Sequence, residues 1–439
     1  MTYNEVLDYL FSQTANYEQQ GVSGYKVGLD NMQALDDHFG HPHQQFRSIH
    51  IGGTNGKGSV SHTLAAMLQV CGYRVGLYTS PHLVDFRERI RVNGKPIPED
   101  YVVRFVESQR EFLELIKPSF FEITTAMAFK YFAEDNVDIA VIEVGLGGRL
   151  DSTNIITPIL SVITNVSLDH TQLLGSTVEQ IAKEKAGIMK KGVPCIIGEA
   201  DAKVRAVFNS ITQETGAPVI YAEDPVVIAS AEPLPNGKGI SYRTIHDVLF
   251  QGELKGLYQQ KNTNTCLYAL HALMKMGYFY NSETPNYLAS IQQEMEYAFL
   301  HVSQLTGLQG RWQIVREAPT VVCDCGHNIG AWDYLSKQLA QVKCHELRIV
   351  FGILEDKDIY AIMQKLPKHA KYYWTKGTTK RAFPETSLKI FGEQFELHGD
   401  CYPTVKAAYD AAIEGSQADD FIYVGGSTYV VADFLKTWE

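Results

Sequence analysis

The segment HIGGTNGKGSV, residues 50–60, carries the residue types that bind a nucleotide phosphate. It follows the apolar run FRSIHI (46–51) and precedes a stretch of helical periodicity from about residue 59 to 71. Exposed backbone N–H groups between a strand and a helix bind anions. Glycines would let the backbone wrap phosphate oxygens closely; they are Gly53, Gly56 and Gly58. These features predict a phosphate-binding loop.

Two side chains of this loop could act directly on ATP. Lys57 would bring a positive charge to the β- and γ-phosphates, and Ser59 a hydroxyl to Mg²⁺. Thr54 and Asn55 complete the loop. The fit to G-x-x-x-x-G-K-[ST] is imperfect, because the first glycine would fall at Ile51 and a further glycine separates the lysine from the serine. The alternative is a glycine-rich tight turn that binds nothing.

Glu143 is a second candidate, because it lies near the end of the apolar segment VDIAVIEVG (137–145). Parallel sheets bind ligands beyond the carboxyl ends of their strands, and Mg²⁺ prefers oxygen donors. A salt-bridged carboxylate of the core is the alternative for Glu143.

The elements that must position these residues alternate short β-branched runs with helical stretches, which predicts parallel sheets with crossover helices. Further strands are expected at 74–79, 159–164 and 193–198, and helices at 177–189 and 259–278. Residues 221–256 contain Pro, Gly and short alternating segments, which predict a small antiparallel insertion.

A second α/β set begins near Thr320, with strands expected at TVVCD, LRIVFG, KYYWT and DFIYVGG. We expect residues 1–296 to form an ATP-binding domain, 297–308 a linker and 309–439 a C-terminal domain. The fold class is therefore α/β. A phosphate-loop nucleotide-binding N-terminal domain with a mostly parallel sheet precedes a smaller, Rossmann-like C-terminal domain.

The composition of the 439 residues is ordinary for a globular protein, with 45% hydrophobic and 20% charged residues. The net charge of -11 weakly opposes non-specific nucleic-acid binding. We expect no signal peptide at MTYNEVLDYLFSQ and no membrane span, since no apolar run reaches about 18 residues. The seven cysteines are scattered without a C-x-x-C pair, as in a reduced, cytoplasmic protein.

The loop GTNGKGS resembles that of folylpolyglutamate synthases and dihydrofolate synthases, which are relatives of the Mur ligases. The resemblance continues, in the family's order, through TSPHL, FRERIRVNG, FFEITTAMAF, VIEVGLGGRLDSTNII, TNVSLDHTQLLGSTVEQIAKEKAGIMK, GRW, DCGHN and GGSTY. The chain departs from the family's usual residues at Arg87, Tyr258, Cys325 and Gly326.

This resemblance implies an ATP-dependent ligase that joins a folate carboxylate to L-glutamate through an acyl phosphate. ATP is a substrate, and Mg²⁺ is the expected cofactor, at two sites. The implied partners are these small molecules, with no nucleic acid and no membrane, and the expected state is a monomer. Within the same class, dihydrofolate synthase or a bifunctional enzyme acting on dihydropteroate is the alternative. A nucleotide-binding regulator without ligase activity is an alternative from another class.

The resemblance also implies a metal shell and a set of catalytic residues. The implied metal ligands are Ser59, Ser80, Glu143, His170 and Lys185, and Lys185 is expected to be carbamylated. The implied catalytic residues are Lys57, Glu143, His170 and Lys185. His is not a favoured Mg²⁺ ligand, so the alternative for His170 is a polar loop residue. The alternative for Lys185, in the sequence KEKAGI, is a solvated helix surface.

The remaining implied contacts extend over both halves of the chain. Asn262, Arg311 and Asp324 match positions that hold adenine, phosphate and ribose. His327 and Ser427 resemble residues near the glutamate site. Phe121 would stack on the folate ring and Asp151 would accept from ring N–H groups. Read without the resemblance, Arg311 is a surface cation and Phe121 a core residue.

Overall fold

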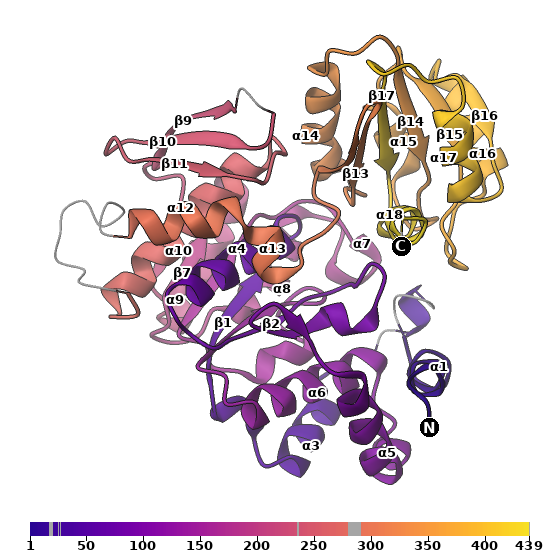
Figure 1. Cartoon of the computed structure of the whole chain (residues 1–439). Helices are drawn as coiled ribbons and strands as arrows, with labels where there is room; N and C mark the ends of the chain where they lie inside the picture. The colour runs from indigo at the N-terminus through magenta and orange to yellow at the C-terminus, as the bar shows by residue number, and fades with distance from the viewer. Residues whose placement is uncertain (17–20, 25, 27, 235–236, 280–290, 439) are drawn as a thin grey trace. The chain divides into compact units, whose positions relative to one another are not determined.

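The computed structural model describes residues 1–16, 21–24, 26, 28–234, 237–279 and 291–438 (Figure 1). The chain divides into two compact units. The first contains residues 1–167, 171–254 and 259–308, and the second contains residues 168–170, 255–258 and 309–439. Two short segments that precede residue 309 in the sequence therefore pack with the second unit.

The first unit is built on an eight-stranded sheet of order β4-β3-β2-β5-β1-β6-β7-β8. The six strands β2, β5, β1, β6, β7 and β8 pair in parallel, in this order across the sheet. Strands β3 and β4 add an antiparallel edge next to β2. The strands are β1 (Arg47–Gly52), β2 (Val75–Tyr78), β3 (Ile90–Val92), β4 (Lys95–Pro96), β5 (Ile139–Glu143), β6 (Leu160–Ile163), β7 (Cys195–Ile197) and β8 (Val219–Tyr221).

Helices cover both faces of this sheet. The α-helices of the unit are α1 (Tyr3–Gln13), α3 (Asp30–His38), α4 (Lys57–Val70), α5 (Glu99–Ile116), α6 (Phe120–Glu134), α7 (Thr171–Leu174), α8 (Val178–Lys185), α9 (Ala202–Thr215), α10 (Gln259–Lys275), α12 (Gln292–Leu300) and α13 (Val302–Thr306). Short 3₁₀ helices lie at η1 (Gly21–Gly24), η2 (Pro42–Gln44), η3 (Phe86–Arg89), η4 (Ser152–Ile155) and η5 (Ala186–Ile188).

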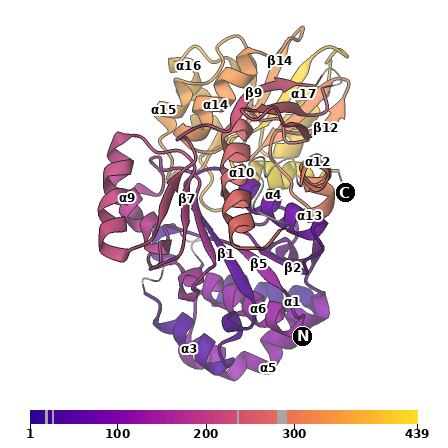
Figure 2. The ribbon, with the colours of Figure 1, turned by 90° about the vertical axis from the view of Figure 1, so that its left-hand side faces the viewer.

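The alternation of side chains along β5 explains this layering. Ile139 and Val141 pack in a core with α4, α10 and α12. Ala140 and Ile142 point to the opposite face, into a core with α1, α3, α5 and α6. Figure 2 shows α4 and α10 on one side of β1, β5 and β2, and α3, α5 and α6 on the other. Because both faces are covered, the parallel strands are continuous apolar runs.

The predicted antiparallel insertion forms a separate three-stranded sheet of order β11-β10-β9. Figure 1 shows this sheet against α12. Its strands are β9 (Ile228–Pro233), β10 (Ile240–Thr244) and β11 (Leu249–Gly252).

The second unit contains a six-stranded sheet of order β12-β13-β17-β14-β15-β16, in which only β12 is antiparallel to its neighbour. Its strands are β12 (Gln313–Glu317), β13 (Thr320–Asp324), β14 (Leu347–Phe351), β15 (Lys371–Trp374), β16 (Gly399–Cys401) and β17 (Phe421–Gly425). Its helices are α14 (Ile329–Ala340), α15 (Ile359–Met363), α16 (Glu385–Gln394), α17 (Val405–Ile413) and α18 (Thr428–Leu435). The fold class expected from the sequence is confirmed.

Residues 297–308, expected as a linker, contain the end of α12 and all of α13. Val302 and Leu308 are buried in the core of the first unit, and His62 Nδ1 lies 2.8 Å from Thr306 Oγ1. The chain passes from one compact unit to the other between Leu308 and Gln309.

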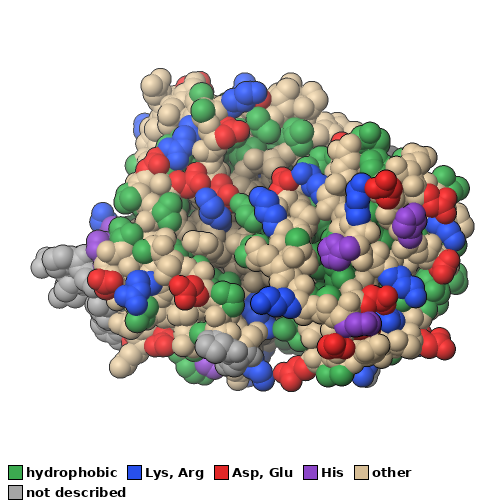
Figure 3. Space-filling model, turned by 90° about the horizontal axis from the view of Figure 1, so that it is seen from above, with side chains coloured by type: hydrophobic (Ala, Val, Ile, Leu, Met, Phe, Trp, Pro, Cys, Tyr) green, Lys and Arg blue, Asp and Glu red, His purple; other side chains and the backbone are tan. Residues whose placement is uncertain are grey.

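No helix among the described residues is long and apolar enough to cross a membrane. On the face drawn in Figure 3, basic and acidic side chains are interspersed rather than gathered by sign.

Candidate active site

The phosphate loop connects β1 to α4, and its backbone requires glycine at two positions. Gly53 and Gly56 have φ angles of 138° and 85°, which side chains disfavour. A Cβ at Gly53 would lie 1.9 Å from Thr164 Oγ1, and one at Gly56 would lie 2.3 Å from Asn262 Oδ1. Only glycine fits in either place, so the neighbouring segments shape the loop as well as its own sequence.

The segment after β6 supports the loop through hydrogen bonds that the sequence analysis missed. Asn165 accepts from Thr54 N through its carbonyl and from Asn55 N through Oδ1, both at 2.9 Å. Thr164 Oγ1 donates to the Asn55 carbonyl at 2.5 Å, and Ser167 N donates to Thr54 Oγ1 at 3.0 Å. The motif TNVSLDH, which contains all three supporting residues, was the available signal.

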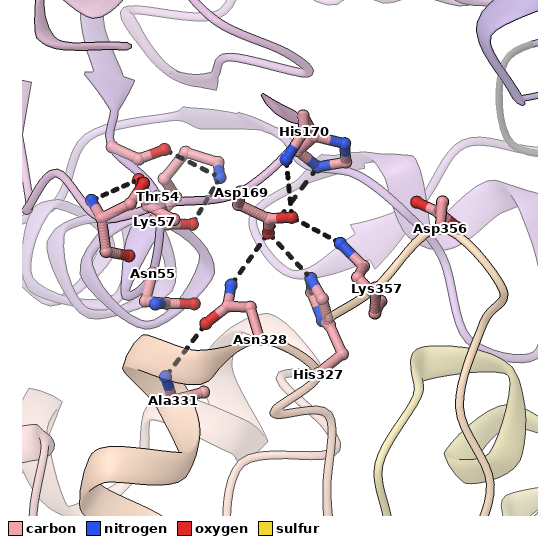
Figure 4. A network of polar contacts seen from close by, with 12 residues as sticks. Thr54, Asn55, Lys57, Asp169, His170, His327, Asn328, Ala331, Asp356 and Lys357 are labelled. Atoms are coloured by element: carbon pink, nitrogen blue, oxygen red, sulfur yellow. Dashed lines mark hydrogen bonds and ion pairs between the residues drawn. The ribbon is translucent and has the colours of Figure 1, made fainter. Parts of the chain in front are cut away.

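Two lysines direct their ammonium groups to the carbonyls of this loop. Lys57 Nζ lies 3.2 Å from Gly53 O and 3.1 Å from Thr54 O (Figure 4). Lys185, the last residue of α8, donates from Nζ to Gly53 O at 2.8 Å. Lys185 is only 3% exposed, so a solvated helix surface is the wrong interpretation of this residue. The structure therefore places two cations at the loop.

Oxygen donors lie at the carboxyl ends of neighbouring strands. Glu143 ends β5, which pairs with both β1 and β2, and its Oε2 accepts from Ser80 N at 3.3 Å. Ser59 lies in the first turn of α4, where its buried Oγ accepts from Gln259 Nε2 at 3.1 Å. Hydroxyl and carboxylate oxygens are suited to Mg²⁺. Gln259, which also accepts from Asn262 Nδ2 at 2.9 Å, was not predicted.

The two candidate folate contacts lie near the loop after β5. Phe121 packs on Gly145, where an added Cβ would be 2.4 Å from the ring. The buried Asp151 accepts from Leu146 N at 2.8 Å, from Thr153 N at 3.0 Å and from Thr153 Oγ1 at 2.5 Å. Burial raises the pKa of Asp151, while these hydrogen bonds oppose that shift. Asp151 therefore shapes the loop, and its contact with a folate stays a prediction.

In the second unit, Asp324 is the centre of a buried hydrogen-bond cluster at the end of β13. It accepts from Tyr258 OH at 2.5 Å, Trp312 N at 2.7 Å and Gly326 N at 2.8 Å. Burial raises the pKa of Asp324, and the Tyr258 hydrogen bond and the Arg311 charge act in the opposite direction. Tyr258 thus supplies a donor to Asp324.

Asp169 forms a second cluster within this unit (Figure 4). Its buried carboxylate lies 2.5 Å from Lys357 Nζ, accepts from Asn328 Nδ2 at 2.9 Å and lies 3.4 Å from His327 Nε2. Although burial raises the pKa of Asp169, the charges of Lys357, His170 and His327 hold it well below its usual value. His170 and His327 were predicted from the sequence, whereas Asp169, Asn328 and Lys357 were not. The DHT motif contains Asp169 and the GHN motif contains Asn328, but Lys357 lies in neither.

The two candidate glutamate contacts follow adjacent parallel strands. His327 comes after β13, and its Nδ1 lies 2.9 Å from Cys325 O. Ser427 comes after β17 and caps α18, accepting from Tyr429 N at 3.1 Å. Since β14 is the next strand in the sheet, Lys357 also follows a strand at this edge.

The predicted site residues thus form two groups. The first unit contains the phosphate loop with the metal and folate candidates Ser80, Glu143, Lys185, Phe121 and Asp151, together with Asn262. The second unit contains His170, Arg311, Asp324, His327 and Ser427.

Comparison with known protein families assigns the two halves separately. Residues 51–263 match the Mur ligase middle domain, and residues 310–428 match the Mur ligase, glutamate ligase domain. These ranges contain the phosphate loop in one case, and Arg311, Asp324, His327 and Ser427 in the other.

The chain is 33% identical over 427 residues to the dihydrofolate synthase/folylpolyglutamate synthase of Bacillus subtilis, covering 94% of this chain and 95% of that protein. Escherichia coli FolC in complex with DHPP and ADP has a TM-score of 0.81 and 29% identity, with 100% and 98% of the two chains covered. A bifunctional folylpolyglutamate synthase/dihydrofolate synthase with Mn, AMPPNP and L-glutamate bound has a TM-score of 0.80 and 27% identity, with coverage of 100% and 98%. The chain belongs to the dihydrofolate synthase/folylpolyglutamate synthase family.

Proposed function

We propose that this protein is an ATP-dependent ligase that forms an amide bond between a folate carboxylate and L-glutamate. The observation that carries the proposal is the phosphate loop, where Lys57 and Lys185 lie at Gly53 O beside strands ending in oxygen donors. A relative with Mn, AMPPNP and L-glutamate bound supports the same set of reactants.

In the proposed reaction, a folate carboxylate attacks the γ-phosphate of ATP. ADP departs, and the carboxylate becomes an acyl phosphate. The glutamate amine then attacks the carbonyl carbon, loses a proton, and phosphate departs as the amide forms. Lys57 would stabilise the charge that develops on the transferring phosphoryl group. The loop N–H groups at the start of α4 would hold the remaining phosphates.

Divalent metal would neutralise phosphate charge and keep the reacting oxygens in line. We infer that Mg²⁺ occupies two sites, supplied by Ser59, Ser80, Glu143, His170 and carbamylated Lys185. The oxygen donors of the first unit support this assignment. Carbamylation would turn the buried Lys185 ammonium into an anionic oxygen ligand. We further propose that Asn262, Arg311 and Asp324 hold the nucleotide, that His327 and Ser427 contact glutamate, and that the enzyme acts in the cytoplasm as a monomer.

Dihydropteroate is the second candidate acceptor, which would make the enzyme bifunctional. The double name of the Bacillus subtilis relative, dihydrofolate synthase/folylpolyglutamate synthase, supports this possibility for the chain. Phe121 and Asp151 would contact the ring of either acceptor, so these residues do not separate the two activities.

A substrate panel tests the proposal. The purified protein would receive ATP, Mg²⁺ and labelled glutamate with either dihydropteroate or tetrahydrofolate derivatives. We expect label in a folate product and ADP release that requires both acceptor and glutamate. Lys57→Ala should lower kcat by at least about 10²-fold, whereas the exposed Lys183→Ala should match the wild type. ATP binding without glutamate-dependent turnover would support the regulator instead.

A further inference from the structure

A buried chain of hydrogen bonds connects strand β1 to the candidate folate contact Asp151. His50 Nε2 lies 2.8 Å from Thr153 Oγ1, and Thr153 Oγ1 lies 2.5 Å from Asp151 Oδ1. His50 and Thr153 are fully buried, and Asp151 is 4% exposed. Because these side chains are shielded from water, their hydrogen bonds must be made within the protein. We refer to His50, Thr153 and Asp151 as the relay.

The direction of each hydrogen bond in the relay follows from the groups that make it. The N–H groups of Leu146 and Thr153 also donate to the Asp151 carboxylate, which favours its ionised form. An ionised carboxylate only accepts, so the single hydroxyl proton of Thr153 goes to Asp151 Oδ1. Thr153 Oγ1 must then accept from His50, which makes Nε2 the protonated nitrogen of the imidazole ring.

The other nitrogen of the imidazole ring agrees with this assignment. His50 Nδ1 is buried and has no hydrogen-bond partner among the residues that the structure describes. A proton on Nδ1 would be a buried donor without an acceptor, whereas a proton on Nε2 has Thr153 Oγ1. Burial lowers the pKa of His50 to about 3. The ring is therefore neutral near pH 7 and carries its one proton on Nε2.

The relay begins on a central strand of the sheet and ends at the loop after β5. His50 pairs with Ile142 of β5 and Ser161 of β6, three residues before Gly53 of the phosphate loop. At the other end, Asp151 Oδ2 accepts from Leu146 N, next to the glycine on which Phe121 packs. The relay thus joins a strand that leads into the phosphate loop to the carboxylate beside the candidate ring contact. Binding groups held by regular elements are placed more accurately than groups held by loops alone.

We propose that His50 and Thr153 are positioning residues, which fix the Asp151 carboxylate for the ring N–H groups of a folate acceptor. Thr153 holds the carboxylate by donating to Oδ1, and His50 holds the Thr153 hydroxyl in the orientation that donates. This inference rests on the proposed ligase function, in which Asp151 contacts the folate ring. A carboxylate that is already oriented loses less entropy when the ring binds. The relay therefore acts on the affinity for the folate and not on the use of ATP.

Thr153→Val tests the relay in the full-length protein, because it removes the hydroxyl with little change of shape. The variant would be assayed with whichever acceptor the wild type uses, dihydropteroate or tetrahydrofolate. We expect its KM for this acceptor to rise about tenfold, as for the loss of a hydrogen bond to a charged group, while its KM for ATP stays that of the wild type. Thr153→Ser keeps the hydroxyl and should restore the acceptor KM. An unchanged acceptor KM in Thr153→Val, or an equal rise in both KM values, would overturn the proposal.

Ser161→Ala is the matched control for loss of a buried hydroxyl. Ser161 is fully buried beside His50 in the sheet, and its Oγ donates to Ile188 O at 2.8 Å. This variant should lower the Tm without changing the KM for the acceptor or for ATP. A rise in the acceptor KM equal to that of Thr153→Val would show a general effect of lost stability and would overturn the relay.

The tautomer of His50 gives a measurement that does not depend on turnover. Nitrogen NMR of the ¹⁵N-histidine-labelled wild type near pH 7 should show the Nε2-protonated ring, with the His50 signals identified by their absence in His50→Gln. A proton on Nδ1 would overturn the relay alone. Absence of glutamate-dependent turnover in the wild type would instead overturn the proposed ligase, and with it the role of the relay in folate binding.

Discussion

At the scale of single residues, burial shows that Lys185 belongs to the phosphate-loop site and not to a solvated helix surface. The letters KEK at 183–185 are typical of an exposed helix, and Lys183 is indeed exposed. Lys185 is two residues further along the helix, where the orientation differs by about 200°, and it points instead to Gly53 O. Burying an ammonium is costly unless its charge is compensated, and carbamylation by CO₂ would replace that positive charge with an anionic oxygen ligand.

We predict that Lys185→Ala is nearly inactive while Lys183→Ala retains activity, as measured by glutamate-dependent ADP release. Added bicarbonate should restore nothing to Lys185→Ala, because alanine has no amine to carbamylate. A crystal structure of the ligand-bound wild type should show an added carboxyl group on Lys185. A free ammonium in such a structure would count against carbamylation.

His50, immediately before the phosphate loop, is fully buried and lies with its Nε2 2.8 Å from Thr153 Oγ1. Burial, with a smaller effect of Lys190, lowers the pKa of His50 to about 3. The unfolded chain therefore binds this proton more readily than the folded chain. The stabilising contribution is complete above about pH 6.5 and is lost as the pH falls from there towards 3.

This linkage predicts a shallower pH dependence for His50→Gln. Between pH 7.5 and 5.5 the wild type should lose about 1.4 kcal/mol more free energy of unfolding than the variant. Urea unfolding at both pH values measures the difference. Between pH 8.5 and 7.5 the two proteins should change in parallel, and a parallel change at lower pH as well would disprove the burial effect.

At the scale of elements, Asp169 connects three segments of the second unit. Its carboxylate contacts the N-cap residue of α14, Asn328, and Lys357 after β14. The side chains of Asp169 and Lys357 are 7% and 6% exposed. Removing one member of such a buried pair leaves the other charge uncompensated, which typically costs about 3–5 kcal/mol.

We therefore predict that Lys357→Met and Asp169→Asn each lower the Tm of the protein. The Tm of the double variant should fall by less than the sum of the two single decreases. The reason is that the double change removes both buried charges together. Thermal unfolding of the four proteins gives the coupling. Because His327 also contacts Asp169, both single variants should raise the KM for glutamate more than that for ATP. Strictly additive Tm changes would refute the coupling.

At the scale of the whole molecule, the candidate residues are divided between two compact units. The phosphate loop belongs to the first unit. Asp324, His327 and Ser427 belong to the second, which also includes residues 168–170 and 255–258. A fragment that ends at Leu308 would keep these two short segments but lose the partners of Asp169 and Tyr258.

We predict that fragment 1–308 binds ATP weakly and ligates nothing, even with excess folate and glutamate. Fluorescent-nucleotide binding and the labelled-glutamate assay measure these two properties. In the intact chain, ATP with folate should compact the molecule in small-angle scattering more than ATP alone, as expected for an enzyme that excludes water. Appreciable ligation by the fragment would show that residues 309–439 are not required for the reaction.

The sequence by itself determined the fold class and most central strands, because buried parallel strands are continuous apolar runs with recognisable ends. The strands it missed, β3, β4, β8, β12 and β16, lie towards the sheet edges, where burial leaves a weaker pattern. The phosphate loop was also predictable, since its glycines and lysine are adjacent in the chain.

Only the tertiary structure identified the groups that act through space. Gln259 at Ser59, Asn165 at the phosphate loop and Lys357 at Asp169 come from segments up to 200 residues away in the chain. Asn165 lies in the motif TNVSLDH, but the sequence does not say which group each of these side chains contacts, because hydrogen-bond partners are set by how elements pack. The orientation of Lys185 belongs to the same class, since periodicity tells which residues share a helix face but not what that face contacts.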